Sequence, residues 1–183
     1  MAFIPELLNL IIAVVVVGYI FTGYVKINKR DPLEALTKRF DFEDFKFAIM
    51  ISAPAVVLHE LAHKFVAIGF GLNAIFQIFP AGLAIGIILK LIGSGFLILA
   101  PGYVLISGAS PLQGSLIAFA GPLLNLVLFL GSWLYLKYNS SKSSRKTVLT
   151  MIMTKEINKW LFIFNMIPVP PLDGFKVIAP LLF

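Results

Sequence analysis

The sequence contains no cysteine. Disulfide bonds, thiolate zinc sites, iron–sulfur clusters and thiol nucleophiles are therefore all excluded. Charge is also scarce, since Asp, Glu, Lys and Arg make up 13% of the 183 residues whereas hydrophobic residues make up 59%. An ordinary soluble domain has about 25% charged residues. This composition excludes a water-soluble globular domain and a disordered chain, and it predicts a membrane protein.

Acidic side chains are fewer than basic ones. The chain has 15 Lys and Arg residues against 9 Asp and Glu residues, for a net charge of +6. In a membrane protein such an excess describes the loops, which anionic lipid headgroups attract. We therefore expect the lipid bilayer as a partner, and we expect no nucleic acid.

Long apolar stretches dominate the remaining sequence. A membrane-spanning helix needs about 20 mostly apolar residues. Five stretches approach this length: residues 7–25, 47–70, 81–100, 115–136 and 160–183. Because no Lys or Arg precedes the first stretch, we interpret it as an uncleaved span rather than a signal peptide.

Polar linkers at residues 26–46 and 137–159 separate these stretches, and the second contains a Ser-rich basic loop. The sequence thus predicts an all-α, multi-pass membrane protein with four or five membrane segments, located in the cell membrane. Two units are expected: an N-terminal span with its basic linker over residues 1–46, and a membrane core over residues 47–183.

One apolar region does not have the pattern of a helix. Residues 96–107 are interrupted by Pro101-Gly102, which indicates a turn. We predict a short β-hairpin here, either re-entrant or interfacial. Irregular backbone is tolerated at membrane depth only where protein or a water-filled cavity covers it.

The second apolar stretch contains His59-Glu60-Leu61-Ala62-His63, and these are the only two histidines of the chain. Residues at i and i+4 share one face of a helix, so both imidazoles can reach one Zn²⁺. Glu60 lies on an adjacent face, where it can take a proton from a water molecule activated by the metal. Chance pairing of two buried histidines is the alternative. Ionisable groups inside an apolar span are costly, which favours a functional site.

A catalytic zinc site usually has three protein ligands. With no further His and no Cys, the third ligand must be an oxygen donor. The acids outside the first linker are Glu6, Glu60, Glu156 and Asp173. Asp173 follows a proline-rich break and precedes Gly174, so its carboxylate can be aimed sideways at a metal. By elimination Asp173 is the predicted third ligand; the alternative is that it only caps the helix that follows.

Two asparagines lie inside apolar stretches. Asn125 could polarise a substrate carbonyl or hold an extended peptide, or it could be a hydrogen-bonding link between helices. Asn165 has the same two interpretations. Its position beside the prolines favours a structural role, although we also count it among the candidate substrate-binding residues.

Three sequence elements, taken in order, resemble the site-2 protease family of intramembrane zinc metalloproteases. They are His59-Glu60-Leu61-Ala62-His63, Gly121-Pro122-Leu123-Leu124-Asn125, and the segment from Asn165 to Leu172-Asp173-Gly174. The resemblance covers residues 47–183. It implies zinc on His59, His63 and Asp173, Glu60 as general base, assistance from Asn125, and membrane-spanning proteins as substrates.

Residues 1–183 carry neither the inserted peptide-binding domain nor the regulatory domain of larger members of that family. A homo-oligomer is one way to replace them. The sequence therefore predicts an intramembrane zinc endopeptidase with one Zn²⁺ per chain, which cleaves single-span membrane proteins. The alternative is a zinc-binding membrane protein without catalysis, either a metal transporter or a scaffold.

Overall fold

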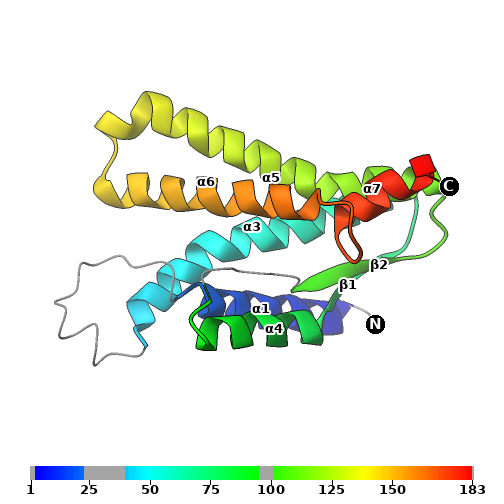
Figure 1. Cartoon of the computed structure of the whole chain (residues 1–183), viewed down its shortest axis with the longest axis horizontal. Coiled ribbons are helices and arrows are strands. Elements are labelled where there is room, and N and C mark those ends of the chain that lie inside the picture. Colours follow the sequence, from blue (N-terminus) through cyan, green and yellow to red (C-terminus); the bar gives the residue numbers. More distant parts are fainter. Residues whose placement is uncertain (1–2, 23–39, 95–100, 183) are drawn as a thin grey trace.

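The computed structural model describes residues 3–22, 40–94 and 101–182. Six helices and one antiparallel strand pair make up most of this part of the chain (Figure 1). The helices are α1 (Phe3–Phe21), α3 (Phe42–Gly69), α4 (Pro80–Leu91), α5 (Pro111–Asn139), α6 (Arg145–Asn165) and α7 (Asp173–Leu182). The strands are β1 (Ala74–Ile78) and β2 (Gly102–Ile106), and the short 3-10 helix η1 (Ser140–Lys142) joins α5 to α6.

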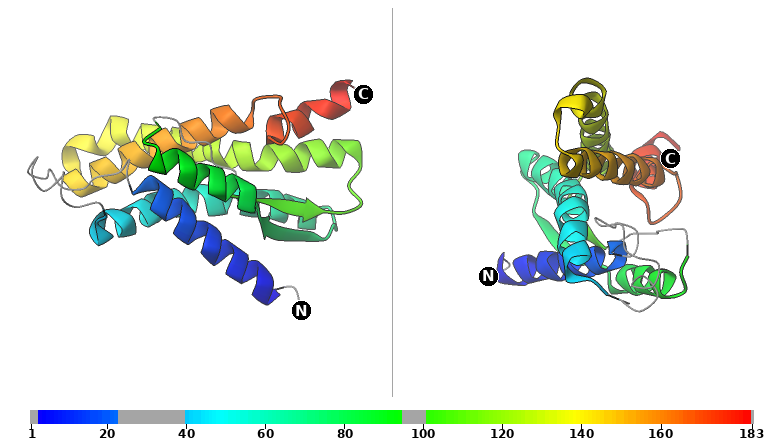
Figure 2. Two further views of the ribbon diagram at one scale, coloured as in Figure 1. Left: turned by 60° about the horizontal axis from the view of Figure 1, so that its bottom comes forward. Right: turned by 90° about the vertical axis from the view of Figure 1, so that its left-hand side faces the viewer.

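Helix α3 is the central element. It begins after Asp41, whose side chain accepts hydrogen bonds from the backbone N–H groups of Glu43 and Asp44, a typical N-cap. Helices α1 and α4 lie on one side of α3, and α5 and α6 lie on the other (Figure 2). A buried side chain on α3 therefore lies between helices from both halves of the chain.

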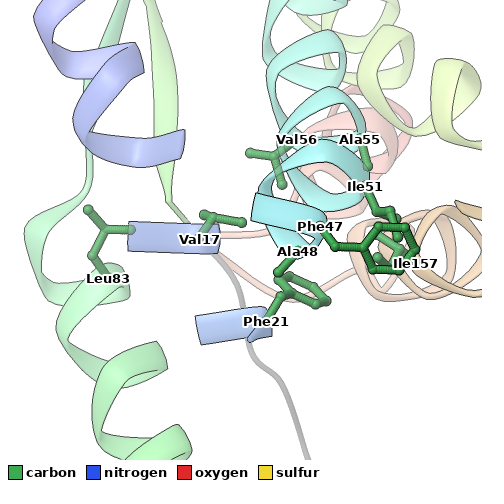
Figure 3. Close-up of a cluster of buried hydrophobic side chains, with 9 residues drawn as sticks. All are labelled: Val17, Phe21, Phe47, Ala48, Ile51, Ala55, Val56, Leu83 and Ile157. Atoms are coloured by element: carbon green, nitrogen blue, oxygen red, sulfur yellow. The ribbon is translucent and has the colours of Figure 1, made fainter. Parts of the chain in front are cut away.

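One apolar cluster holds these layers together (Figure 3). Its members come from α1, α3, α4 and α6, and α3 supplies five of the nine: Val17, Phe21, Phe47, Ala48, Ile51, Ala55, Val56, Leu83 and Ile157. Burying a large apolar side chain contributes about 1.5–3 kcal/mol in water. In lipid, close packing replaces that driving force, which suits the small Ala48 and Ala55 on the central helix.

Three helices of the described residues are long and apolar enough to cross a membrane: α1, α3 and α5. Their outward faces are apolar too, since Ile4 and Leu112 are 78% and 69% exposed. Such surfaces are unfavourable in water and ordinary in lipid. The chain therefore has the features of a membrane protein. Within the described residues, the predicted spans at 7–25, 47–70 and 115–136 correspond to the apolar helices α1, α3 and α5, and residues 23–25 lie outside the described part of the chain.

The third predicted segment, residues 81–100, is not one continuous helix. Helix α4 has 12 residues and ends at Leu91, and Gly93 then adopts a φ of 70°. At about 1.5 Å per residue α4 is about 18 Å long, well short of the roughly 30 Å of bilayer hydrocarbon. Residues 95–100 lie outside the described residues.

The linker predicted at residues 137–159 is largely helical. Helix α5 continues to Asn139, and α6 begins at Arg145 after Ser144, whose side chain accepts a hydrogen bond from Thr147 N. Only the tight turn between them fits the predicted loop. Most of the basic side chains of this region lie on helix surfaces, where they are compatible with regular structure.

The strand pair differs from the predicted hairpin. Residues 102–106 form a strand, but its partner is β1 at residues 74–78, on the far side of α4. The pairing is antiparallel, with Phe76 opposite Val104. The remainder of the expected hairpin, residues 96–100, lies outside the described residues.

The outer edge of β1 is covered by α1. The carboxylate of Glu6, which is 8% exposed, accepts a hydrogen bond of 2.9 Å from Phe76 N and is paired with Lys64 Nζ. Opposed residues of an antiparallel pair either exchange both hydrogen bonds or neither. Because Phe76 N points to Glu6, the N–H and C=O of Val104 point away from β1. The outer edge of β2 thus carries backbone groups of Val104 that make no bond to β1.

Candidate zinc site

The structure brings together the three predicted metal ligands. His59 Nε2 and His63 Nε2 are 3.1 Å apart, and Asp173 Oδ2 is 3.1 Å from the first and 3.2 Å from the second. All three side chains are largely buried. Residues from α3 and α7, separated by more than a hundred positions in the sequence, thus direct one donor atom each at a common point.

Local structure explains this convergence. The two histidines are one turn apart on α3, and their rings meet edge to face with centroids 4.7 Å apart. Asp173 is the first residue of α7, immediately after a turn that contains Pro170 and Pro171. Gly174 is required there, because a Cβ atom at this position would lie 2.8 Å from the carbonyl oxygen of Ile167.

Helix α7 is also tied to α5. Ser115 Oγ donates a hydrogen bond of 2.9 Å to the carbonyl oxygen of Val177, one turn beyond Asp173. The carboxylate is therefore fixed both by the turn that precedes it and by the helix that it begins. Asp173 does begin a helix, as the capping alternative required, but its side chain is directed at the two imidazoles.

Hydrogen bonds on the far side of each ring determine which nitrogen is free. His63 Nδ1 lies 2.7 Å from the carbonyl oxygen of Ile117, which can only accept, so Nδ1 carries the proton. The neutral ring then directs the lone pair of Nε2 into the cluster. A backbone carbonyl on the second nitrogen is the usual support for a metal-bound histidine.

His59 is supported by a side chain instead. Its Nδ1 lies 2.5 Å from Asn125 Oδ1, and the Nδ2 group of Asn125 donates to the carbonyl oxygen of Ala55. That second bond fixes the amide so that its oxygen faces His59. The imidazole must then donate from Nδ1, and its Nε2 lone pair also enters the cluster.

Two imidazole lone pairs and a carboxylate oxygen therefore face one another without a proton to share. Such an arrangement is repulsive unless a cation lies between the three atoms. Two histidines and one carboxylate are a common ligand set for catalytic zinc, which leaves a fourth position open. The donor set fits one zinc ion held by His59, His63 and Asp173.

Two curated relatives of this chain are named as zinc metalloproteases. The protein named "Putative zinc metalloprotease MJ0611" of Methanocaldococcus jannaschii is 31% identical over 176 residues, which are 94% of this chain and 83% of the relative. The chain belongs to this family of zinc metalloproteases. "Putative zinc metalloprotease YwhC" of Bacillus subtilis is 30% identical over 142 residues, 68% of this chain and 64% of that protein. No family model matches the chain, and no solved structure does.

The zinc site of this metalloprotease opens onto a cavity of about 410 Å³. Glu60 lines the cavity together with the three ligands, and β2 forms another part of its wall. The Glu60 side chain is thus on the side of the metal cluster that a water molecule or a peptide can reach. Lys176, one turn after Asp173, also lines the cavity.

The two predicted asparagines occupy different places. Asn165 lines the cavity and donates from Nδ2 to the carbonyl oxygen of Leu161. The lining residues of the described segments do not include Asn125, which is fully buried behind His59. This placement favours an orienting role for Asn125 over the predicted contact with a substrate.

A third asparagine was missed by the sequence analysis. Asn158 is fully buried on α6, and its Oδ1 accepts a hydrogen bond of 2.8 Å from Asn125 Nδ2. It lies within residues 137–159, which the sequence analysis interprets as a polar linker. Its spacing of seven residues from Asn165, two helical turns, is the signal that places both on one helix face.

Glu156, the other acid considered as a ligand, takes no part in the cluster. It is paired with Lys159 and Lys155 on the surface of α6. The hydrogen bond from Lys159 holds the pKa of Glu156 below its usual value. Of the candidate acids, Asp173 is therefore the one whose carboxylate lies beside the two histidines.

Close approach of α5 to the zinc ligands depends on Gly121. A Cβ atom there would lie 2.7 Å from His59 Cε1 and would overlap the ring of His63. Gly121 is one turn before Asn125, so both face α3. Within the Gly-Pro-Leu-Leu-Asn element, Gly121 thus leaves space for both imidazole rings, and Asn125 supports the ring of His59.

Proposed function

We propose that this zinc metalloprotease is an intramembrane endopeptidase of the site-2 protease type. It would cleave peptide bonds within or near the membrane-spanning segment of single-span proteins, and it would reside in the cell membrane as a multi-pass protein. The observation that carries the proposal is the position of the zinc site. Its two histidines lie in α3, one of the three helices long enough to cross a bilayer, and its cavity is enclosed by neighbouring helices and β2.

Zinc, when bound, supplies a Lewis acid that acidifies water and stabilises negative charge on a carbonyl oxygen. Glu60 takes the proton from the attacking water and returns a proton to the amine that leaves when the C–N bond breaks. His59, His63 and Asp173 hold the metal. The cavity separates this chemistry from lipid while it admits water.

The substrate segment must be extended, because a helix conceals its carbonyl groups in its own hydrogen bonds. Strand β2 offers a way to hold such a segment. The N–H and C=O of Val104 point away from β1, and β2 lines the cavity. We therefore include in the proposal that the substrate adds to β2 as a further strand.

The test of the protease uses the purified chain in lipid nanodiscs, with bound zinc counted, and a panel of single-span membrane proteins. Wild type is compared with Glu60→Gln. Glu43→Gln is the matched control, because Glu43 is an exposed glutamate on the same helix, paired with Lys46. We expect one zinc per chain in all three proteins and cleavage by all except Glu60→Gln.

Mass spectrometry of the products locates the cleaved bond. A bond inside or beside the apolar segment supports the intramembrane proposal, whereas cleavage confined to a soluble tail contradicts it. One zinc per chain with no cleavage by the wild type would favour a zinc-binding membrane protein without catalysis, such as a transporter or scaffold.

The strand addition has its own test. Val104→Pro removes the outward N–H of β2 but no bond of the β1–β2 ladder, and Val104→Ala shortens the side chain while the N–H is kept. We expect cleavage to fall in the proline variant alone, through a higher KM, with zinc content unchanged. Equal cleavage by both variants would refute strand addition and leave the protease assignment intact.

A further inference from the structure

Asn158 is a fully enclosed polar side chain near the zinc site, and it neither binds the metal nor lines the cavity. It is fully buried on α6, two contacts away from the metal ligands. Its Nδ2 group donates a hydrogen bond of 2.8 Å to the carbonyl oxygen of Thr154, and its Oδ1 accepts from Asn125 Nδ2 at 2.8 Å. Three helices, α3, α5 and α6, thus meet in one chain of hydrogen bonds.

The direction of this chain is fixed at both ends by backbone carbonyl groups. The carbonyl oxygen of Thr154 can only accept, so the Asn158 amide turns its oxygen toward Asn125. Asn125 then has two acceptors before its Nδ2 group: Asn158 Oδ1, and the carbonyl oxygen of Ala55 at 3.2 Å. Both its hydrogens are used, so its own oxygen must face His59.

The consequence reaches the metal ligand. With Asn125 Oδ1 before it, His59 carries its proton on Nδ1 and keeps the Nε2 lone pair for the metal. A rotated Asn125 amide would present hydrogens to Nδ1 and favour the opposite tautomer, in which Nε2 carries a proton and cannot bind. In the rotated amide, Asn125 Oδ1 would face the carbonyl oxygen of Ala55 and Asn158 Oδ1. Both are acceptors, so these two contacts would be unfavourable.

We propose that Asn158 is a positioning residue of the zinc site, which selects the metal-binding tautomer of His59 through the amide of Asn125. His63 has no such dependence, because the backbone of Ile117 supports it directly. The inference depends on the zinc site alone and not on the identity of the substrate. Its test can fail while the protease proposal stands, and the reverse is also true.

The chain itself makes a direct test possible, because it contains only two histidines. Ring-¹⁵N-labelled histidine introduces four observable imidazole nitrogens, and NMR of the metal-free protein, at an alkaline pH where the ¹⁵N shifts no longer change with pH, reports the tautomer of each neutral ring. In the wild type we expect both rings to be protonated on Nδ1. Zinc affinity is measured in parallel by competition with a chelator.

Two variants separate the hydrogen bond from the packing. Asn158→Leu keeps a similar volume and removes the acceptor, whereas Asn158→Asp, neutral when buried, keeps an oxygen acceptor for Asn125. We expect Asn158→Leu to give a mixture of His59 tautomers, an unchanged His63, and zinc affinity lower by about 10- to 100-fold. Asn158→Asp should recover most of both properties.

Asn165→Leu is the matched control. It is the same substitution on the same helix, and it removes the same kind of bond, here to the carbonyl oxygen of Leu161. We expect zinc affinity and the tautomer of His59 to remain as in the wild type.

Three results would overturn the proposal. One is an Asn158→Leu protein whose His59 stays wholly protonated on Nδ1 with unchanged zinc affinity. The second is a change of His63 together with His59, which would indicate general disruption of the site. The third is an equal loss in Asn165→Leu.

Discussion

Substitution of Gly121 by alanine should damage the zinc site far more than the fold. The added methyl group would lie 2.7 Å from His59 Cε1 and would overlap His63. Carbon atoms in contact prefer about 3.5–4.0 Å, so the rings or helix α5 must move by about 1 Å. Metal–ligand distances tolerate only about 0.2 Å. The displacement therefore exceeds what the coordination geometry can absorb.

The expected effects on the free energy of unfolding and on zinc affinity differ strongly. Overpacking costs about 1–3 kcal/mol, and the better helix propensity of alanine returns about 1 kcal/mol, so the free energy of unfolding should change little. A misplacement of about 1 Å at a reacting centre costs about 100-fold in rate. We expect a comparable loss of zinc affinity in Gly121→Ala, with only a small change of Tm.

The assay combines chelator competition for zinc with thermal unfolding in the same detergent. Gly131→Ala is the control, because Gly131 lies on the same helix and nothing lies within 4 Å of an added Cβ atom. It should bind zinc normally and be at least as stable as the wild type. If Gly121→Ala bound zinc as tightly as the wild type, the close approach of α5 would not be what positions the rings.

Three further predictions concern the metal and the edge of the sheet. Asp173→Asn should abolish stoichiometric zinc binding, measured by metal analysis after gel filtration, because a neutral amide replaces the only anionic ligand; retained zinc would contradict the assignment. Removal of zinc by a chelator should lower Tm, and added zinc should restore it, because the metal binds only the folded protein. Glu6→Gln should destabilise the fold by about 1–3 kcal/mol, because Lys64 and Phe76 N lose their charged partner. In thermal unfolding, the double variant with Lys64→Met should recover part of that loss.

Several features of the site were predictable because they depend on local geometry. Two histidines four residues apart must share a helix face, and the scarcity of acids left Asp173 as the third ligand. The long apolar helices followed from hydropathy alone. These inferences needed only spacing and composition, which a single sequence contains.

The sheet was predicted only in part, since strand pairing is not local. The strand at residues 102–106 was expected, but its partner at residues 74–78 is separated from it by a whole helix. Most of helix α6 was missed because residues 137–159 were interpreted as a polar linker. The Ser144 cap before Thr147 was the signal that marked its beginning.

The support of His59 could not be predicted, because it depends on how three helices pack. Asn125 appeared as a polar residue in an apolar span, with a structural and a functional interpretation equally open. Its contacts with Ala55 and His59 distinguish them, and they exist only in the folded molecule.

The distance along the chain between the zinc ligands has a consequence for biosynthesis. Asp173 follows His63 by 110 residues, so a ribosome that adds about 5–20 residues per second needs roughly 5–20 s to supply it after the second histidine. Until then the cluster lacks one of its three ligand atoms, so we expect no stoichiometric zinc site and no proteolysis by the unfinished chain. We therefore expect the zinc site to form only when α7 docks against α5, as one of the last steps of folding.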